Sequence, residues 1–150
     1  MILDRKGIEE LLPHREPFLF VDNVEKLEEG KSIVASYTFP LDSFFFKGHF
    51  PEMPIVPGVI LLEAMAQAAG VLGYKTDGSN WREKGAILLK LDRVVFRKTV
   101  HPGDKVVMEA VIEHIRGQMV KFKAKATVNG ERCAEATLLA RFTGPIKTME

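Results

Sequence analysis

The sequence predicts an α+β fold in which one long central helix is wrapped by a curved antiparallel sheet of about six strands. Three observations indicate this fold: an apolar stretch at residues 53–74 carries a single charge, alternating apolar and polar residues recur, and turn dipeptides separate the alternating segments. A helix that is apolar on almost every side must be covered on most sides, and one curved sheet can do that. We expect a single domain over residues 1–150, a length sufficient for one well-formed core.

The N-terminal part of the chain predicts a short helix followed by a pair of strands. A helix is expected over residues 8–12, because Pro13 would end it. Strands are expected at residues 18–27 and 31–39, on either side of a turn at Glu29-Gly30. The apolar stretch at 53–74 then forms the long helix.

The C-terminal half predicts the remaining strands. Residues 120–128 alternate apolar side chains with lysines and a threonine, which gives one dry and one wet face. Asn129-Gly130 follows directly and is a strong hairpin signal, so a partner strand is expected at 132–142. Two further strands are expected upstream, at residues 87–100 and 105–115.

The composition excludes several classes of protein. Hydrophobic residues make up 46% and charged residues 27%, and 21 basic against 20 acidic residues give a net charge of +1, so a strongly basic nucleic-acid binder is excluded by bulk charge. Four scattered histidines and one cysteine, Cys133, predict no zinc cluster and no intrachain disulfide, which favours a reducing cytoplasm. The N-terminus carries no secretory signal. Glu63, Gln67 and two early prolines make a membrane span the weaker interpretation of the apolar stretch.

Three features close together in the sequence predict acid–base chemistry. His49, in an aromatic loop, is a side chain of the type that can accept or donate a proton. Glu63, in the apolar helix, needs either a partner or a raised pKa. Pro57-Gly58 begins the helix, with Pro57 expected at its first position, and exposes amides suited to an oxyanion. These groups could abstract a proton next to a carbonyl. Each alone also has a structural interpretation: an ordinary loop histidine, an ion pair or a plain helix start.

Two segments resemble a known family closely. HFPEMPIVPGVILLEAMAQAAG at residues 49–70 and LPHREPFLFVD at 12–22 are similar to the 3-hydroxyacyl-acyl carrier protein dehydratases of bacterial fatty acid synthesis, and the order of the other segments matches nearly throughout. The resemblance implies a hot-dog fold. It also implies removal of water from a (3R)-3-hydroxyacyl thioester on acyl carrier protein to give the trans-2-enoyl thioester.

The resemblance also implies roles for single residues. His49 falls on the catalytic histidine and Glu63 on the catalytic carboxylate, which in this family come from different subunits of a homodimer, with three dimers commonly forming a hexamer. Gly58 matches the glycine whose amide holds the thioester oxygen. The related dehydratase-isomerases carry aspartate in place of Glu63, so dehydration without isomerisation is expected. No metal or diffusible cofactor is expected, because elimination from a thioester needs neither.

Apolar residues near these positions are candidates for contact with the substrate. Phe50 and Val59 are expected to touch the acyl chain or the thioester. An acyl tunnel, with ordinary core as the alternative, is predicted from Phe44, Phe45, Phe46, Ile55, Val59, Leu62 and Leu88.

The charge distribution suggests where the acyl carrier protein docks. Residues 82–125 carry eleven basic and five acidic residues, a local charge of +6, while residues 1–30 carry four and eight, a local charge of −4. Arg93, Arg97 and Lys98 are expected to receive the acidic carrier and its phosphopantetheine phosphate, with a solvated sheet face as the alternative. Nucleic acid is not expected, since no aromatic and basic platform is present.

Two other functions fit the same fold. One is a hot-dog thioesterase that hydrolyses the thioester, because a fold does not fix a function. The other is a non-catalytic acyl-chain-binding module, which the presence of both His49 and Glu63 opposes. Release of a thiol from a 3-hydroxyacyl thioester would indicate the first, and binding without turnover would indicate the second.

Overall fold

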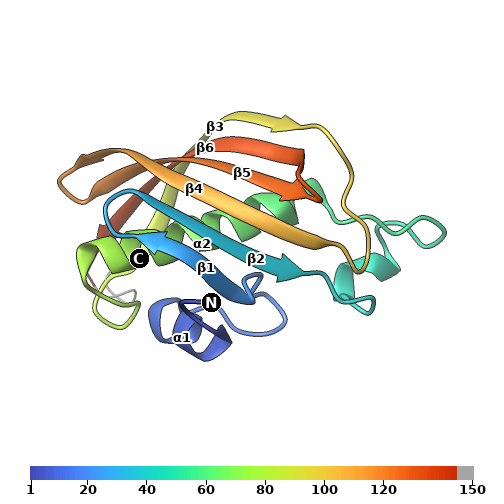
Figure 1. Ribbon diagram of the computed structural model, residues 1–150, viewed down its shortest axis with the longest axis horizontal. Helices are drawn as coiled ribbons and strands as arrows, with labels where there is room; N and C mark the ends of the chain where they lie inside the picture. Colours follow the sequence, from blue (N-terminus) through green and yellow to red (C-terminus); the bar gives the residue numbers. More distant parts are fainter. Residues whose placement is uncertain (145–150) are drawn as a thin grey trace.

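A computed structural model describes residues 1–144, and Figure 1 shows one curved sheet wrapped around a long helix. The sheet is antiparallel throughout, in the order β1-β2-β4-β5-β6-β3. The expected sheet of six strands around one central helix is confirmed. The elements are α1 Arg5–Leu11, β1 Asn23–Glu28, β2 Ser32–Thr38, the 3-10 helix η1 Phe44–Lys47, α2 Gly58–Asp77, β3 Gly85–Phe96, β4 Lys105–Arg116, β5 Met119–Val128 and β6 Glu131–Thr143.

Helix α2 forms the centre of the molecule and contributes eleven buried residues to the interior. It begins at Gly58, one position later than expected, because Pro57 is its cap rather than its first residue. It ends at Asp77, where Gly78 adopts a left-handed conformation and its amide donates to the Tyr74 carbonyl. None of the helices within residues 1–144 combines the length and apolarity that crossing a bilayer requires.

Two predicted strands are wrong at one end. The strand predicted at 18–27 begins only at Asn23, because the Phe20 amide donates to the Gln67 side chain of α2 rather than to a neighbouring strand. The strand predicted at 87–100 ends at Phe96. Beyond it the chain turns toward the segment before α2, where the Val100 carbonyl accepts a hydrogen bond from the Val56 amide.

The hairpin between β5 and β6 follows the predicted pattern. Asn129 and Gly130 have φ angles of 51° and 80°, the left-handed conformations that a tight hairpin turn of this kind requires. Along β5, Val120 and Phe122 are buried while the intervening Lys121 is exposed, so the alternation in the sequence corresponds to a core face and a solvent face.

Strand β3 forms one edge of the sheet (Figure 1) and carries exposed apolar side chains. Among the strands of residues 1–144 it pairs only with β6, and its exposed apolar side chains are Leu88, Leu89, Leu91, Val94, Val95 and Phe96. Natural proteins usually protect edge strands with charges, prolines or a covering element, because an unprotected edge pairs with other chains. An apolar edge of this length therefore indicates an interaction surface.

Candidate active site

Glu63 lies in a cavity between α2 and the sheet. The residue sits about one and a half turns from the start of α2, and the cavity has a volume of about 230 Å³. The strands contribute a mostly apolar wall. The lining residues are Leu12, Pro13, His14, Glu63, Ala66, Gln67, Ala69, Gly70, Tyr74, Ala86, Ile87, Leu88, Phe122, Leu138, Ala140 and Phe142.

Two polar side chains lie against the same oxygen of the Glu63 carboxylate. Gln67 Nε2 donates to Glu63 Oε2 at 2.9 Å, and His14 Nε2 lies 3.4 Å from that oxygen. Burial raises the pKa of Glu63, but the neighbouring His14 and the hydrogen bond from Gln67 outweigh it and leave the pKa below its usual value. Of the two possibilities that the sequence left open, a partner and a raised pKa, the structure contains the partner.

Gln67 connects the carboxylate to the polypeptide backbone. Its Oε1 accepts from the Phe20 amide at 2.7 Å, and its Nε2 donates to the Phe18 carbonyl at 2.9 Å as well as to Glu63. An amide hydrogen can only be donated and a carbonyl can only accept, so these two backbone groups fix which end of the Gln67 side chain faces Glu63. Gln67 can reach Glu63 because residues four apart lie on the same face of a helix.

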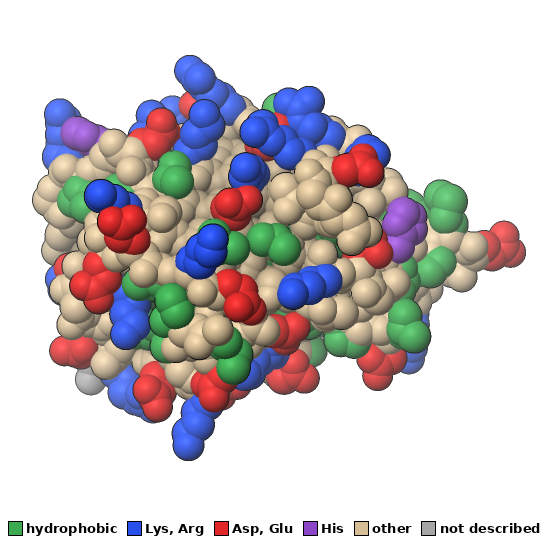
Figure 2. All heavy atoms as spheres, viewed as in Figure 1, with side chains coloured by type: hydrophobic (Ala, Val, Ile, Leu, Met, Phe, Trp, Pro, Cys, Tyr) green, Lys and Arg blue, Asp and Glu red, His purple; other side chains and the backbone are tan. Residues whose placement is uncertain are grey.

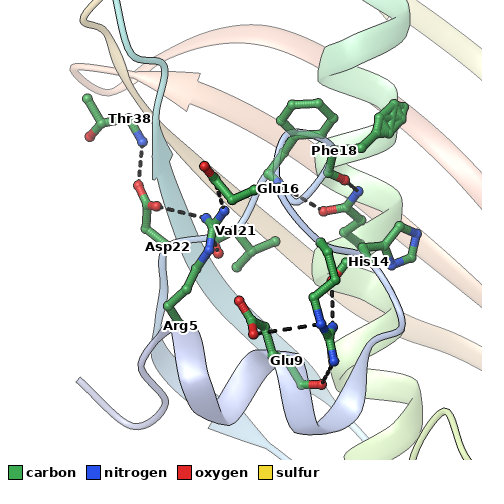
Figure 3. Close-up of polar contacts among 11 residues, drawn as sticks. Arg5, Glu9, His14, Glu16, Phe18, Val21, Asp22 and Thr38 are labelled. Atoms are coloured by element: carbon green, nitrogen blue, oxygen red, sulfur yellow. Dashed lines mark hydrogen bonds and ion pairs between the residues drawn. The ribbon is translucent and has the colours of Figure 1, made fainter.

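His14 is a residue of this site that the sequence reasoning did not single out. It lies in the segment between α1 and β1, beside α2 (Figure 3). Its contact with Glu63 joins positions 49 residues apart in the chain, which no helix or strand periodicity can reveal. The only signal was its place within the LPHR sequence that carries part of the family resemblance.

His49 follows η1 and is oriented by its own loop. Its Nδ1 lies 3.2 Å from the Ile55 carbonyl oxygen, and the Ile55 amide donates back to the His49 carbonyl at 3.0 Å. The ring of Phe50 stacks on the imidazole, with centroids 4.3 Å apart. Because the Ile55 carbonyl can only accept, this contact places a hydrogen on Nδ1 and leaves the lone pair on Nε2.

Gly58 is the first residue of α2 and lies directly under an aromatic ring. A Cβ atom at this position would be 2.9 Å from the ring of Phe96, so a larger residue would displace that side chain. The Ile60 and Leu61 amides both donate to the Pro57 carbonyl. The amides of Gly58 and Val59 precede them and have no acceptor within the helix, as at any helix start.

Comparison with known proteins identifies the family. The FabA-like domain matches residues 12–137. The chain belongs to the FabA-like family. Its relatives include proteins named 3-hydroxyacyl-[acyl-carrier-protein] dehydratase FabZ. The one from Thiobacillus denitrificans is 44% identical over 140 residues, covering 92% of this chain and 96% of the relative. The one from Listeria welshimeri is 41% identical over 138 residues, covering 92% and 94%. The expected family and class of enzyme are confirmed.

Solved structures agree on the fold. The dehydratase heterocomplex ApeI:P from Xenorhabdus doucetiae matches with a TM-score of 0.74 at 19% identity, covering 94% of this chain and 92% of that chain. A hypothetical thioesterase from Streptococcus pneumoniae with coenzyme A matches with a TM-score of 0.63 at 15% identity, covering 82% and 86%. These likenesses concern the fold alone, and the expected hot-dog fold is confirmed.

In this FabA-like chain the predicted site residues form two groups. Glu63 lies in the cavity with Gln67 and His14, whereas His49 is outside the set of described residues that line it. Val59 is 69% exposed and Phe50 is 47% exposed. Of the residues predicted to form an acyl tunnel, Leu88 lines this cavity.

The predicted docking residues of this FabA-like chain lie on or just after β3. Arg97 pairs with Glu135 and Lys98 with Glu131, both acidic residues of β6. Arg93 is exposed and has a left-handed backbone with φ of 50°. Within residues 1–144 no cluster of three or more histidine, cysteine or acidic side chains has the arrangement of a metal site.

Proposed function

We propose that this protein removes water from (3R)-3-hydroxyacyl thioesters on acyl carrier protein, in fatty acid biosynthesis, and gives the trans-2-enoyl thioester without isomerisation. The observation that carries this proposal is Glu63, a carboxylate that accepts a hydrogen bond from Gln67 and lies beside His14 in a mostly apolar cavity. Family membership and the names of the relatives support it. No metal or diffusible cofactor is needed for this chemistry, and we expect the reaction to take place in the cytoplasm.

His49 is the proposed base. With a hydrogen on Nδ1 shared with the Ile55 carbonyl, its Nε2 lone pair is free to take the proton from C2 of the substrate. As that C–H bond breaks, negative charge develops on the thioester oxygen. The free Gly58 amide and the positive end of the α2 dipole stabilise this charge.

We propose that Glu63 accepts a hydrogen bond from the C3 hydroxyl of the substrate, directly or through a water molecule. The electron pair of the C2–H bond forms the C2–C3 double bond, and the C3–O bond breaks. The departing hydroxide needs one proton to become water. Because the pKa of Glu63 is below its usual value, this residue has no proton to give near neutral pH. The protonated His49 returns the proton it took, and Glu63 orients the leaving group.

We also propose that one site takes its histidine and its carboxylate from two copies of the chain. His49 does not line the cavity that holds Glu63, and the loop around it exposes Leu41, Phe44 and Met53. The apolar edge of β3 offers a surface on which a second copy can pair. A homodimer with shared sites, assembled three times in a hexamer, fits both observations.

The acyl carrier protein is the proposed partner, docking through Arg93, Arg97 and Lys98. These residues lie on or next to β3, the same strand whose Leu88 lines the Glu63 cavity. A carrier bound here could direct its phosphopantetheine arm toward that cavity. Because Arg97 and Lys98 already face glutamates of β6, Arg93 offers the cation with the least competition.

The test is an assay with 3-hydroxyacyl-acyl carrier protein that follows the enoyl product and free thiol separately. We expect enoyl formation without thiol release, and a loss of about 1,000-fold in kcat for His49→Ala. His114→Ala, which removes an exposed histidine of β4 outside the cavity, is the matched control. Thiol release would indicate a thioesterase. Full activity of His49→Ala would contradict the mechanism, and binding without turnover by the unmodified protein would contradict the enzymatic proposal.

A further inference from the structure

We propose that His14 is a positioning residue for Glu63, and that its Nε2–H holds one carboxylate oxygen so that the other faces the substrate. The inference rests on the proposed dehydratase function, in which Glu63 orients the leaving hydroxyl. His14 itself touches neither the substrate nor His49 in this scheme. Its effect on turnover passes entirely through the carboxylate.

The geometry assigns different tasks to the two oxygens of Glu63. The Phe20 amide and the Phe18 carbonyl fix the orientation of Gln67, so the group that Gln67 presents to Glu63 Oε2 is its NH₂. His14 Nε2 approaches the same oxygen at 3.4 Å. Two donors therefore converge on Oε2, and Oε1 is left to accept a hydrogen bond from a hydroxyl or a water.

The surroundings of His14 also select its tautomer. Its Nδ1 is buried and has no hydrogen-bond partner among residues 1–144. A hydrogen on Nδ1 would be a buried donor without an acceptor, which is unfavourable, while a hydrogen on Nε2 points to a carboxylate. The Nε2–H tautomer therefore satisfies both the ring and Glu63.

Few other charges face this pair. Among the described residues that line the cavity, the titratable side chains are His14, Glu63 and Tyr74. Burial raises the pKa of Tyr74 to about 12, so its hydroxyl stays neutral. The contributions of β3, β5 and β6 to the lining are all apolar, from Ala86, Ile87, Leu88, Phe122, Leu138, Ala140 and Phe142. From the α1 side, Arg15 directs its guanidinium to backbone carbonyls and to Glu9. The imidazole of His14 is therefore the ring that faces the carboxylate.

A positioning residue must itself be held, and the segment that carries His14 is fixed at both ends. Arg15 donates to the carbonyls of Leu12 and His14 at 2.9 and 2.6 Å. At the other end Arg5 donates to the Val21 carbonyl and to Asp22, each at 3.1 Å, and Asp22 accepts from the Thr38 amide (Figure 3). These bonds connect the His14 segment to α1 and to β2.

The main test compares His14→Leu with His14→Gln. Leucine removes the donor, whereas the glutamine NH₂ can occupy the place of Nε2. We expect His14→Leu to lower kcat about tenfold with little change in KM, because the lost hydrogen bond acts on the step that Glu63 assists. The pKa of the Glu63 carboxyl, followed by ¹³C NMR, should rise in His14→Leu, since Glu63 loses a group that lowers it. His14→Gln should restore the rate and return the pKa of Glu63 toward its original value.

An unchanged pKa of Glu63 in His14→Leu would overturn the proposal, as would a His14→Gln variant no better than His14→Leu. Thermal unfolding of both variants separates a loss of folded protein from a loss of rate. A measurement on the unmodified protein needs no variant: ¹⁵N NMR of the His14 ring at pH 8 should report the Nε2–H tautomer, and an Nδ1–H tautomer would also overturn the proposal. If the unmodified protein fails to dehydrate its substrate, the proposed function fails, while the tautomer measurement still reports on the contact.

Discussion

Glu63 and His49, the two titratable groups of the proposed site, lie in surroundings of opposite character. Glu63 is partly buried in its cavity, and its neighbour Gln67 is connected by hydrogen bonds to the backbone of the segment before β1. His49 lies in the segment between β2 and α2, whose exposed apolar side chains gather at the projecting end of the molecule (Figures 1 and 2). One region is complete within a single copy of the chain, and the other leaves apolar surface uncovered.

This difference suits the different roles proposed for Glu63 and His49. A carboxylate that must accept one hydrogen bond in a fixed direction benefits from a rigid support. A base that must meet a substrate entering from outside can lie on a loop that another subunit covers. The contrast also predicts which changes affect folding and which affect assembly.

The largest expected effect tests whether one active site combines His49 of one copy of the chain with Glu63 of another copy. His49→Ala and Glu63→Gln should each lower kcat by about 100-fold or more, since each removes an acid–base group or its orienting partner. Refolded as a mixture, the two variants should regain about one quarter of the unmodified activity, because half of the dimers are mixed and each mixed dimer has one intact site. The measurement is turnover of the mixture against each variant alone.

The control is each variant taken alone through the same refolding step, which should leave it inactive. Absence of recovery, together with proof by mass spectrometry that mixed dimers form, would show that His49 and Glu63 of one chain serve the same site. The two regions would then have to meet within one copy.

A smaller effect compares the stability of the two regions. Gln67→Leu leaves the Phe20 amide and the Phe18 carbonyl without their partner inside the protein, and should lower the free energy of unfolding by about 2 kcal/mol. Phe50→Ala, in the projecting loop, should lower it by less than about 1 kcal/mol because its side chain is already half exposed. Urea unfolding measures both, and equal losses would contradict the contrast between the two regions.

The smallest expected effect concerns the surface through which substrate arrives. Arg93→Glu should raise the KM for carrier-bound substrate about fivefold and leave the KM for a short pantetheine analogue unchanged, because only the carrier brings acidic groups to this surface. Lys123→Glu, on the solvent face of β5, is the matched control. Similar changes for both substrates would argue against docking at Arg93.

The parts of the fold and of the site that the sequence predicted are those that residues close together in the chain determine. Glu63 and Gln67 are four residues apart in a helix, so their contact follows from helix geometry. The hairpin at Asn129-Gly130 follows from the backbone conformations that these two residues favour. Both are decided within a few residues of the chain.

The parts that could not be predicted depend on contacts distant in sequence. Residues 18–22 carry a pattern that fits a strand, yet the Gln67 side chain takes the hydrogen bond that would have continued the sheet. His14 reaches Glu63 only once α2 is packed against the segment after α1. Likewise, the glutamates that face Arg97 and Lys98 belong to β6, so the sequence overstated the free charge of that surface.

The hydrogen bonds to Glu63 also bear on how the protein tolerates acid. A carboxyl whose pKa is lower in the folded state than in the unfolded chain stabilises the fold above its unfolded pKa, and this contribution is lost as the pH falls through the folded value. Functional carboxylates in apolar cavities often reduce stability, because burial favours their neutral form. Here His14 and Gln67 lower the pKa of Glu63 by more than burial raises it, so the ionised carboxylate stabilises the fold. The group that orients the leaving hydroxyl therefore also helps the fold to resist acid unfolding.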